Sequence, residues 1–389
     1  MRDKHHYLDY AATSAVRPPA VAEAVHTFLV QVGATPGRGG HRLAQEAGRI
    51  AVRCRKALAR ILGLPEDPSR VVFALNATQG LNAALHGVLR PSDIAVVTAY
   101  DHNAVLRPLH RLEVDRGVVV RRVAGAPDGS VDLEEVRNAL DGARLLVVNA
   151  ASNVLGTLLP LKEMAALARE AGALVLVDAA QWAGHFPGRL AEDGADMVAF
   201  TGHKGLLGPQ GVGGLWLRDG IDLSPFCSGG TGGNSLELDM PRQYPERMEA
   251  GSGNAPGMAG LLAGIEFLES KGVEGLHERE MGLKGVLREG LASIPGIRVL
   301  SPAAPEGVGI VTVISDRAHP SELAERLDRE WGVMVRYGLN CAPEVHRMLG
   351  TEKQGAVRFS LGWASTLQDV EQAVRGVDAI TAAPRAPIS

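Results

Sequence analysis

An aspartate and a lysine stand at the ends of two short apolar stretches of this sequence. Residues 173–177 read ALVLV and lead into Asp178, and residues 196–200 read DMVAF and lead into the motif TGHKG, which contains Lys204. Runs of this kind are typical of the covered strands of a parallel sheet. Ligands bind such sheets at the carboxyl ends of the strands. We therefore expect the carboxylate and the amine to face one crevice.

A buried carboxylate and a lysine amine together favour one kind of chemistry, that of pyridoxal phosphate (PLP). The carboxylate keeps the ring nitrogen of this cofactor protonated, and the lysine binds its aldehyde covalently. A lysine held at contact distance from the substrate can then move a proton, with an effective molarity of about 10⁵ M or more. Each residue also has an ordinary explanation: Asp178 could cap a helix, and Lys204 could be a solvated loop lysine.

Polar residues follow three other predicted strands (71–74, 94–98 and 144–149), namely Thr78, His102 and Asn153. The segment NATQG around Thr78 precedes a helical run, so its backbone N–H groups could cradle a phosphate, although any capped helix looks similar. His102 could stack on a cofactor ring and handle protons, or it could be an ordinary surface histidine. A right-handed crossover into the strand before Asp178 would bring Asn153 beside that carboxylate.

The elements that must position these residues alternate between strand-like and helix-like up to about residue 217, which is the pattern of an α/β fold. Beyond residue 256 the order changes to a long helical region over 257–293, followed by short strands and helices. With 389 residues the chain is too long for one ordinary core. We expect an N-terminal arm that packs with the smaller domain, a large PLP-binding domain and a small C-terminal α+β domain, over residues 1–18, 19–256 and 257–389.

The composition is that of a globular protein, with 46% hydrophobic and 22% charged residues. The net charge is −4 and the basic residues are scattered, so we expect neither a nucleic-acid nor a membrane partner. Cys54, Cys227 and Cys341 lack the spacing of a metal site or a disulfide framework. The first residues lack the apolar core of a secretory signal, and no apolar run approaches the roughly 18 residues of a spanning helix. We expect a cytoplasmic protein.

Seven motifs follow one another along the chain: YLDYAATS, SNVLGT, LVLVDAAQ, FTGHKGLLGPQGVGGLW, EAGSGNAP, RYGLNCAPEVH and VRFSLG. Together they resemble the class V aminotransferase-like PLP enzymes, and within them the cysteine desulfurase and selenocysteine lyase group. The resemblance covers nearly the whole chain. It implies PLP fold type I, the fold of aspartate aminotransferase, with a mainly parallel seven-stranded sheet in the large domain. It also implies homodimers whose sites lie near the subunit interface.

The resemblance implies a role for each matching residue. Lys204 would attach the cofactor, Asp178 would hold its ring nitrogen and His102 would stack on its ring. Arg358 would pair with the substrate carboxylate through its bidentate fork, next to Asn153. Cys341 stands where desulfurases carry the nucleophile. The remaining cofactor contacts would be Gln181 at the ring oxygen, Asn153 beside the ring, Thr78, Thr201 and His203 at the phosphate, and Ser252 at the phosphate of the neighbouring subunit.

The function implied is removal of sulfur from L-cysteine, or of selenium from L-selenocysteine, to give alanine and a persulfide on Cys341 that a sulfur-acceptor protein would drain. Two alternatives stay open: a related enzyme that performs transamination or C–S β-elimination without a persulfide, and a non-catalytic PLP-bound scaffold that carries sulfur. Cys341 itself could be buried filler, as lone cysteines often are. A free thiol has a pKa of about 8.5, so a nucleophilic cysteine needs a nearby cation, for which Arg336, His346 and Arg347 are the candidates.

Two positions depart from the family pattern. Tyr10 stands where many members have asparagine, and Asn340, directly before Cys341, stands where many have histidine. The second change removes an acid or cation from the neighbourhood of the cysteine, so sulfur transfer could differ in rate here.

Overall fold

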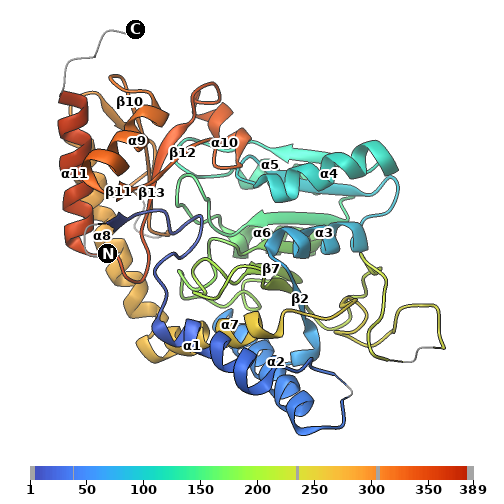
Figure 1. Cartoon of the computed structure of the whole chain (residues 1–389). Coiled ribbons are helices and arrows are strands. Elements are labelled where there is room, and N and C mark those ends of the chain that lie inside the picture. The colour runs from blue at the N-terminus through green and yellow to red at the C-terminus, as the bar shows by residue number, and fades with distance from the viewer. Residues whose placement is uncertain (1–4, 38, 234–235, 304–306, 383–389) are drawn as a thin grey trace.

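The fold is organised around a seven-stranded sheet with the strand order β2-β8-β7-β6-β5-β3-β4 (Figure 1). The structure is a computed structural model that describes residues 5–37, 39–233, 236–303 and 307–382. β8 is antiparallel to both of its neighbours, and the other pairs are parallel. The mixed, mainly parallel sheet implied by the resemblance is confirmed. Its strands are β2 (Val71–Ala74), β3 (Ile94–Thr98), β4 (Val119–Val123), β5 (Leu145–Asn149), β6 (Leu174–Asp178), β7 (Met197–Thr201) and β8 (Gly213–Leu217).

Helices cover both faces of this sheet because its central strands are apolar on both sides. Successive residues of a strand point to opposite faces. In β5, Leu145 and Val147 join one apolar core, whereas Leu146 and Val148 join the other. The first core includes residues of α3 (Ala77–Val88) and α4 (Asn103–Arg116). The second includes residues of α2 (Arg42–Ile61), α5 (Leu133–Ala139), α6 (Leu161–Glu170) and α7 (Ala255–Lys271).

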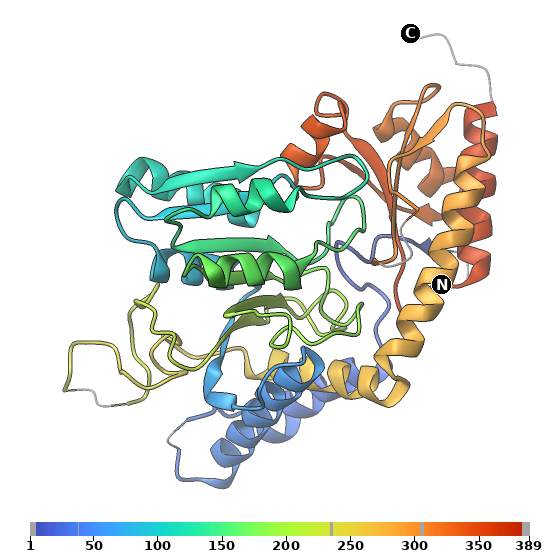
Figure 2. The same cartoon turned by 180° about the vertical axis from the view of Figure 1, so that it is seen from behind.

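A four-stranded antiparallel sheet, in the order β12-β13-β10-β9, forms the second part of the fold. α8 runs alongside α11 against it (Figure 2). The strands are β9 (Ile297–Val299), β10 (Ile310–Ser315), β12 (Arg336–Gly338) and β13 (Ala356–Ser360). The helices of this part are α8 (Val273–Ala292), α9 (Pro320–Trp331), α10 (Pro343–Met348) and α11 (Leu367–Ala382).

The N-terminal arm connects the two sheets before it enters α1 (Pro19–Thr27). Its strand β1 (His6–Tyr7) pairs in parallel with β11 (Val333–Met334), which follows α9. Ser14 then binds the segment after β7, because its backbone N–H donates to the carbonyl of His203. The arm is therefore placed where it can contact groups that come from both sheets.

The long helical region predicted over 257–293 is two helices in the structure. α7 ends at Lys271 and α8 begins at Val273, with Gly272 between them at a φ of 77°. Glycine adopts this conformation without the strain that a side chain would bring. The chain changes direction there and passes from the large sheet to the small one (Figure 2).

The boundaries given for the N-terminal arm and the two domains stay predictions. Among the described helices, none is long and apolar enough to cross a membrane.

Candidate active site

A cavity of about 150 Å³ opens at the carboxyl ends of β3, β5, β6 and β7. The parallel arrangement of these strands explains why side chains far apart in sequence meet there. Asn76 and Asn149, which are not among the predicted site residues, also line the cavity. The predicted site residues that line it are Thr78, His102, Asn153, Asp178, Gln181, Thr201, His203 and Lys204.

Asp178 is the last residue of β6 and is buried, and Lys204 follows the end of the neighbouring strand β7 and is half-buried. Burial raises the pKa of Asp178, while a hydrogen bond from the N–H of Ala180 and the charge of Lys204 oppose the rise. Burial also lowers the pKa of Lys204 to about 8, and the charge of Asp178 works against that. A desolvated carboxylate of this kind is stabilised by a cationic partner. A protonated pyridine nitrogen is such a partner.

The backbone around Lys204 is held by the N-terminal arm. The hydroxyl of Ser14 donates to the carbonyl of Lys204 at 2.8 Å, and the backbone N–H of Ser14 donates to the carbonyl of His203 at the same distance. The hydroxyl of Thr13 donates to the His203 carbonyl as well, at 3.1 Å. These bonds fix the lysine at its backbone, so its long side chain alone needs to move.

One end of the cavity has the groups of an anion site. The hydroxyl oxygen of Thr201 and Nδ1 of His203 are buried and have no hydrogen-bond partner in the described part of the chain. Thr78 lies beside them in the first turn of α3, whose N-terminus is capped by Asn76. Burial lowers the pKa of His203 to about 4, so its ring is neutral and donates a single N–H. Unpaired buried donors at a helix N-terminus suit a phosphate group.

His102 satisfies both of the explanations that the sequence left open. Its Nδ1 accepts the backbone N–H of Ala104 at 3.0 Å and thereby caps α4, and its ring also lines the cavity. Burial lowers the pKa of His102 to about 4, with a smaller contribution from the charge of Lys204. A neutral ring whose Nδ1 is an acceptor carries its proton on Nε2. The flat ring can therefore stack on a cofactor and offer one N–H.

Cys341 does not line the cavity but lies in a loop attached to its wall. The carbonyl of Asn340 accepts the side-chain N–H of Asn153 at 2.6 Å, and the carbonyl of Cys341 accepts the backbone N–H of Asn103 at 2.8 Å. Asn340 and Cys341 have φ values of 48° and 59°, a region that side-chain-bearing residues enter only when neighbours hold them there. The thiol is exposed, so Cys341 is not core filler.

The sequence and structure of this chain match known proteins over nearly its whole length. Residues 6–373 match the family described as "Aminotransferase class-V". The chain belongs to the class-V aminotransferase family. This family depends on PLP. The buried carboxylate of Asp178, the amine of Lys204 and the unpaired polar atoms of Thr201 and His203 fit this cofactor.

Several relatives within the class-V aminotransferase family carry the name of one activity. A "Probable cysteine desulfurase" of Pyrococcus abyssi is 34% identical over 377 residues, which cover 94% of this chain and 91% of the relative. A "Cysteine desulfurase" of Serratia proteamaculans is 31% identical over 384 residues, 96% of this chain and 93% of the relative. The solved cysteine desulfurase of Thermococcus onnurineus NA1 has a TM-score of 0.92 at 32% identity, covering 97% of this chain and 95% of that one. The PLP fold type I expected from the sequence is thereby confirmed.

Arg358, the residue predicted to bind the substrate carboxylate in this class-V enzyme, is nearly enclosed, with 3% of its side chain exposed. Its Nη1 donates to the carbonyl of Asn153 at 3.0 Å, which places it beside the cavity wall. Its Nη2 lies 3.3 Å from a carboxylate oxygen of Asp9 in the arm. Asp9 could not be predicted as its partner, because 349 positions separate it from Arg358 and no spacing pattern links the two.

Of the three candidate cations for Cys341, Arg336 is the one whose charge interacts with the cysteine. His346 was a wrong candidate: its side chain is buried, Nδ1 bonds the hydroxyl of Thr351, and burial lowers its pKa, so it is neutral. Arg347 forms an ion pair with Glu344. Burial of this kind cannot be read from sequence separation.

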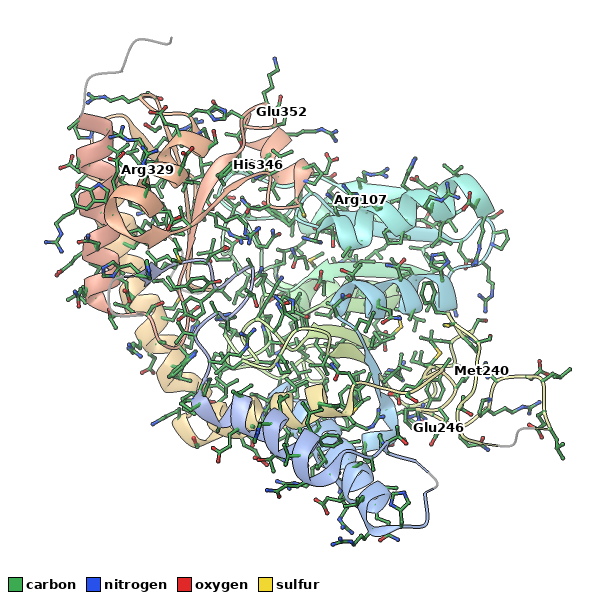
Figure 3. All side chains as sticks on the ribbon, viewed as in Figure 1. Arg107, Met240, Glu246, Arg329, His346 and Glu352 are labelled. Carbon is green, nitrogen blue, oxygen red and sulfur yellow. The ribbon has the colours of Figure 1, made fainter. Side chains whose placement is uncertain are left out.

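Ser252 does not reach the cavity of its own chain. It is exposed in the segment before α7. This segment follows the loop that carries Met240 and Glu246 away from the large sheet (Figure 3). The base of this segment is fixed because the carboxylate of Glu249 pairs with the buried guanidinium of Arg55 at 2.8 Å. That Ser252 contacts a phosphate in a neighbouring subunit stays a prediction.

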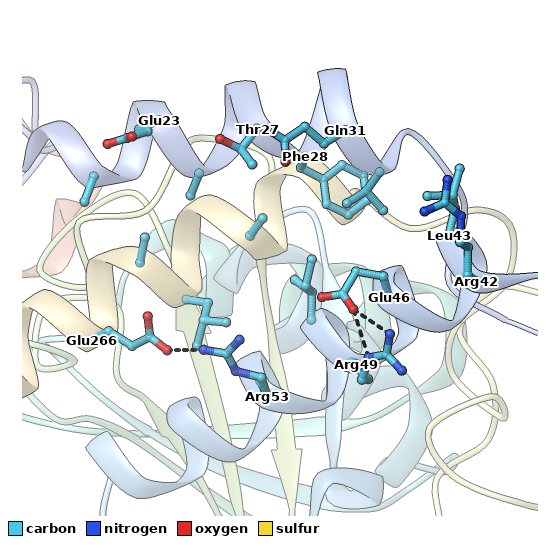
Figure 4. Close-up of a pocket in the computed structure, with 17 residues that line it drawn as sticks. Glu23, Thr27, Phe28, Gln31, Arg42, Leu43, Glu46, Arg49, Arg53 and Glu266 are labelled. Atoms are coloured by element: carbon cyan, nitrogen blue, oxygen red, sulfur yellow. Dashed lines mark hydrogen bonds and ion pairs between the residues drawn. The ribbon is translucent and has the colours of Figure 1, made fainter.

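A larger groove, of about 710 Å³, lies between α1, α2 and α7 and is a less suitable catalytic site (Figure 4). Its floor is apolar and includes Phe28, while the ion pairs of Arg49 with Glu46 and of Arg53 with Glu266 stand at its rim. Its described lining contains no lysine, histidine or cysteine. The groove therefore lacks the groups that the family's chemistry requires.

PLP uptake by the apoprotein is expected to accelerate as the pH rises through about 8. An amine attacks an aldehyde only in its neutral form, and burial lowers the pKa of Lys204 to about 8. Stopped-flow absorbance of PLP mixed with apoprotein, across a pH series, measures the midpoint. Asp178→Asn removes a charge that raises this pKa, so its midpoint should move to lower pH. If the rate keeps rising until the pH reaches the pKa of a free lysine, about 10.4, the assignment of Lys204 as the attacking amine is contradicted.

Proposed function

We propose that this chain is a PLP-dependent cysteine desulfurase that takes sulfur from L-cysteine and holds it as a persulfide on Cys341. The observation that carries the proposal is the attachment of the Cys341 loop to the cavity wall. Asn153 lines the cavity and binds the backbone of Asn340, so the nucleophile and the cofactor site share one support. The names of the relatives point to the same activity.

The cofactor is assigned to the cavity through five side chains. Lys204 would attach it and Asp178 would hold the ring nitrogen, while His102 would cover one face of the ring. Thr201 and His203, with their unpaired polar atoms, would bind the phosphate at the N-terminus of α3. When bound, PLP withdraws electrons from the substrate's Cα and thereby makes its Cβ–S bond easier to break.

The remaining steps belong to the residues of this chain. Arg358 binds the α-carboxylate, and the neutral amine of Lys204 takes and returns the proton at Cα. The thiolate of Cys341 attacks the substrate sulfur, so an S–S bond forms as the Cβ–S bond breaks. Cβ keeps the electron pair of the broken bond and gains a proton. In balance, L-cysteine and the Cys341 thiol give L-alanine and a Cys341 persulfide.

The proposal includes a homodimer and a sulfur-acceptor protein. The loop before Ser252 exposes Leu236 and Leu238 almost completely, at 94% and 103%, which suits a segment that a second copy covers. Cys341 is exposed, so an acceptor's thiolate can reach a persulfide there. L-selenocysteine, whose carbon–selenium bond is weaker, is a second substrate under the same scheme.

The test is an assay of products from L-cysteine by the purified, PLP-loaded protein. Alanine is expected in a rapid first phase of about one equivalent per site, then slowly as excess L-cysteine removes the persulfide, and faster with a phosphine, which also releases sulfide. A β-lyase would instead form pyruvate and ammonia without a reductant, and an aminotransferase would need a 2-oxo acid. A scaffold would form no alanine at any cysteine concentration. Any of these three outcomes would refute the desulfurase assignment.

A further inference from the structure

Two arginines face each other across neighbouring strands of the small sheet. Arg336 in β12 and Arg358 in β13 are direct partners in the antiparallel register. Side chains so paired lie on one face with Cβ atoms about 4.5–5.5 Å apart, and like charges in this arrangement repel. The pair therefore needs an anion to be stable. Asp9, which comes from the arm at the other end of the chain, supplies it.

The contacts of Asp9 are strongly unequal. Arg336 makes three of them, with N–O distances of 2.8, 3.1 and 3.2 Å, and these form a bidentate fork. Arg358 makes one, at 3.3 Å. Bidentate charge-assisted pairs are the stronger kind. Asp9 is thus mainly the counter-ion of Arg336. Arg358 keeps a buried Nε for which the described residues offer no hydrogen-bond partner.

We propose that Asp9 is a specificity-determining residue, which cancels the charge of Arg336 and leaves the arginine pair with one positive charge, so that the site selects amino acids with a single carboxylate. This rests on the proposed function, in which Arg358 binds the α-carboxylate. Two cations and one anion leave one unit of positive charge, and that carboxylate neutralises it. A second acid on Cβ would then meet Asp9 instead of a free guanidinium.

The register with Arg358 puts Arg336 beside the group that binds the α-carboxylate, within reach of a substituent on Cβ under this proposal. Arg336 is the first residue of β12, which leads into the loop of Cys341, the residue that must approach the substrate sulfur. Its charge interacts with those of both Cys341 and Lys204. Without Asp9, its fork would be open to a carboxylate or a sulfinate at that position. Asp9 thus acts against a competing class of substrate.

A purely structural role for Asp9 predicts a different result. The arm has attachments besides Asp9: β1 pairs with β11, His6 pairs with Asp369 at 2.7 Å, and the carbonyl of Ala11 accepts the side-chain N–H of Gln181 at 2.9 Å. Removing the charge of Asp9 therefore leaves the arm in place. Asp369→Asn removes a carboxylate from another contact of the arm and is the matched control.

The experiment compares L-aspartate with L-asparagine, which have nearly the same shape and differ by one charge. Their dissociation constants for the PLP-loaded protein are measured by calorimetry and by the change in cofactor absorbance. Because both share the α-carboxylate, their ratio reports the environment of Cβ. The wild type should prefer L-asparagine. Asp9→Asn should shift the ratio toward L-aspartate about tenfold, the size expected for one partly screened charge.

The double variant Asp9→Asn/Arg336→Gln should restore the wild-type ratio, and Asp369→Asn should keep it. The proposal is overturned if Asp9→Asn leaves the ratio unchanged, if the double variant fails to restore it, or if neither ligand binds the wild type. Binding of these ligands requires no sulfur chemistry. If the ratio depends on the charge at Asp9 but the protein forms no alanine from cysteine, the desulfurase assignment fails and the proposed role of Asp9 stands.

Discussion

Lys204→Ala is expected to abolish covalent attachment of PLP and to reduce alanine formation from L-cysteine by at least about 10⁴-fold. The substitution removes the amine that attaches the cofactor and also the base held next to Cα, and a base so held has an effective molarity of about 10⁵ M or more. Mass spectrometry after borohydride reduction measures attachment, and an alanine assay measures activity. The fold should persist, because the arm binds Lys204 through its backbone carbonyl and not through its side chain.

Lys284 provides the matched control for this substitution. It is buried, its pKa is likewise lowered to about 8 by burial, and it lies near the carbonyl of Gly156 and does not line the cavity. Lys284→Met should therefore keep a reducible cofactor adduct. An adduct that persisted in Lys204→Ala, or that disappeared in Lys284→Met alone, would mean that the wrong lysine has been assigned.

Cys341→Ala is expected to leave cofactor binding intact and to reduce alanine formation by at least about 10³-fold. Loss of a nucleophile removes the whole covalent route and not merely a part of its rate. Absorbance of the bound cofactor checks that the site is intact, since the thiol lies outside the cavity lining. Mass spectrometry of the wild type after brief reaction should show one extra sulfur on the peptide that contains Cys341.

Cys227 is the matched control because it too is exposed but lies in the segment after β8. Cys227→Ala should keep both the activity and the extra sulfur on Cys341. Undiminished alanine formation in Cys341→Ala would favour a route without a persulfide, and the sulfur-transfer part of the proposal would fall.

The sequence predicted the cavity well because its chemistry sits at strand ends. Apolar runs located β6 and β7, and the rule that parallel strands present their carboxyl ends together placed Asp178 and Lys204 in one cavity. Motif resemblance supplied the fold and most of the lining residues. The prediction worked where one residue's place follows from its own strand.

What the sequence could not predict are contacts between distant segments. Asp9 meets Arg336 and Arg358 only because the arm returns to the small sheet, and Asn153 meets Asn340 only because the loop of Cys341 closes on the cavity wall. Neither contact leaves a periodic or compositional sign. Asn149 was missed for a different reason: it is the last residue of an apolar strand, and its amide was not weighed as a site group.

The left-handed backbone at Asn340 and Cys341 has a consequence for the proposed transfer of sulfur to an acceptor. Both carbonyls are tied inward, to Asn153 and Asn103, while the thiol faces the solvent. A sulfur atom received there would already stand outside the chamber that shelters the vitamin-derived ring. Transfer of that sulfur to a second protein would then not require the chamber to open. A new amino acid could enter while the previous sulfur atom leaves.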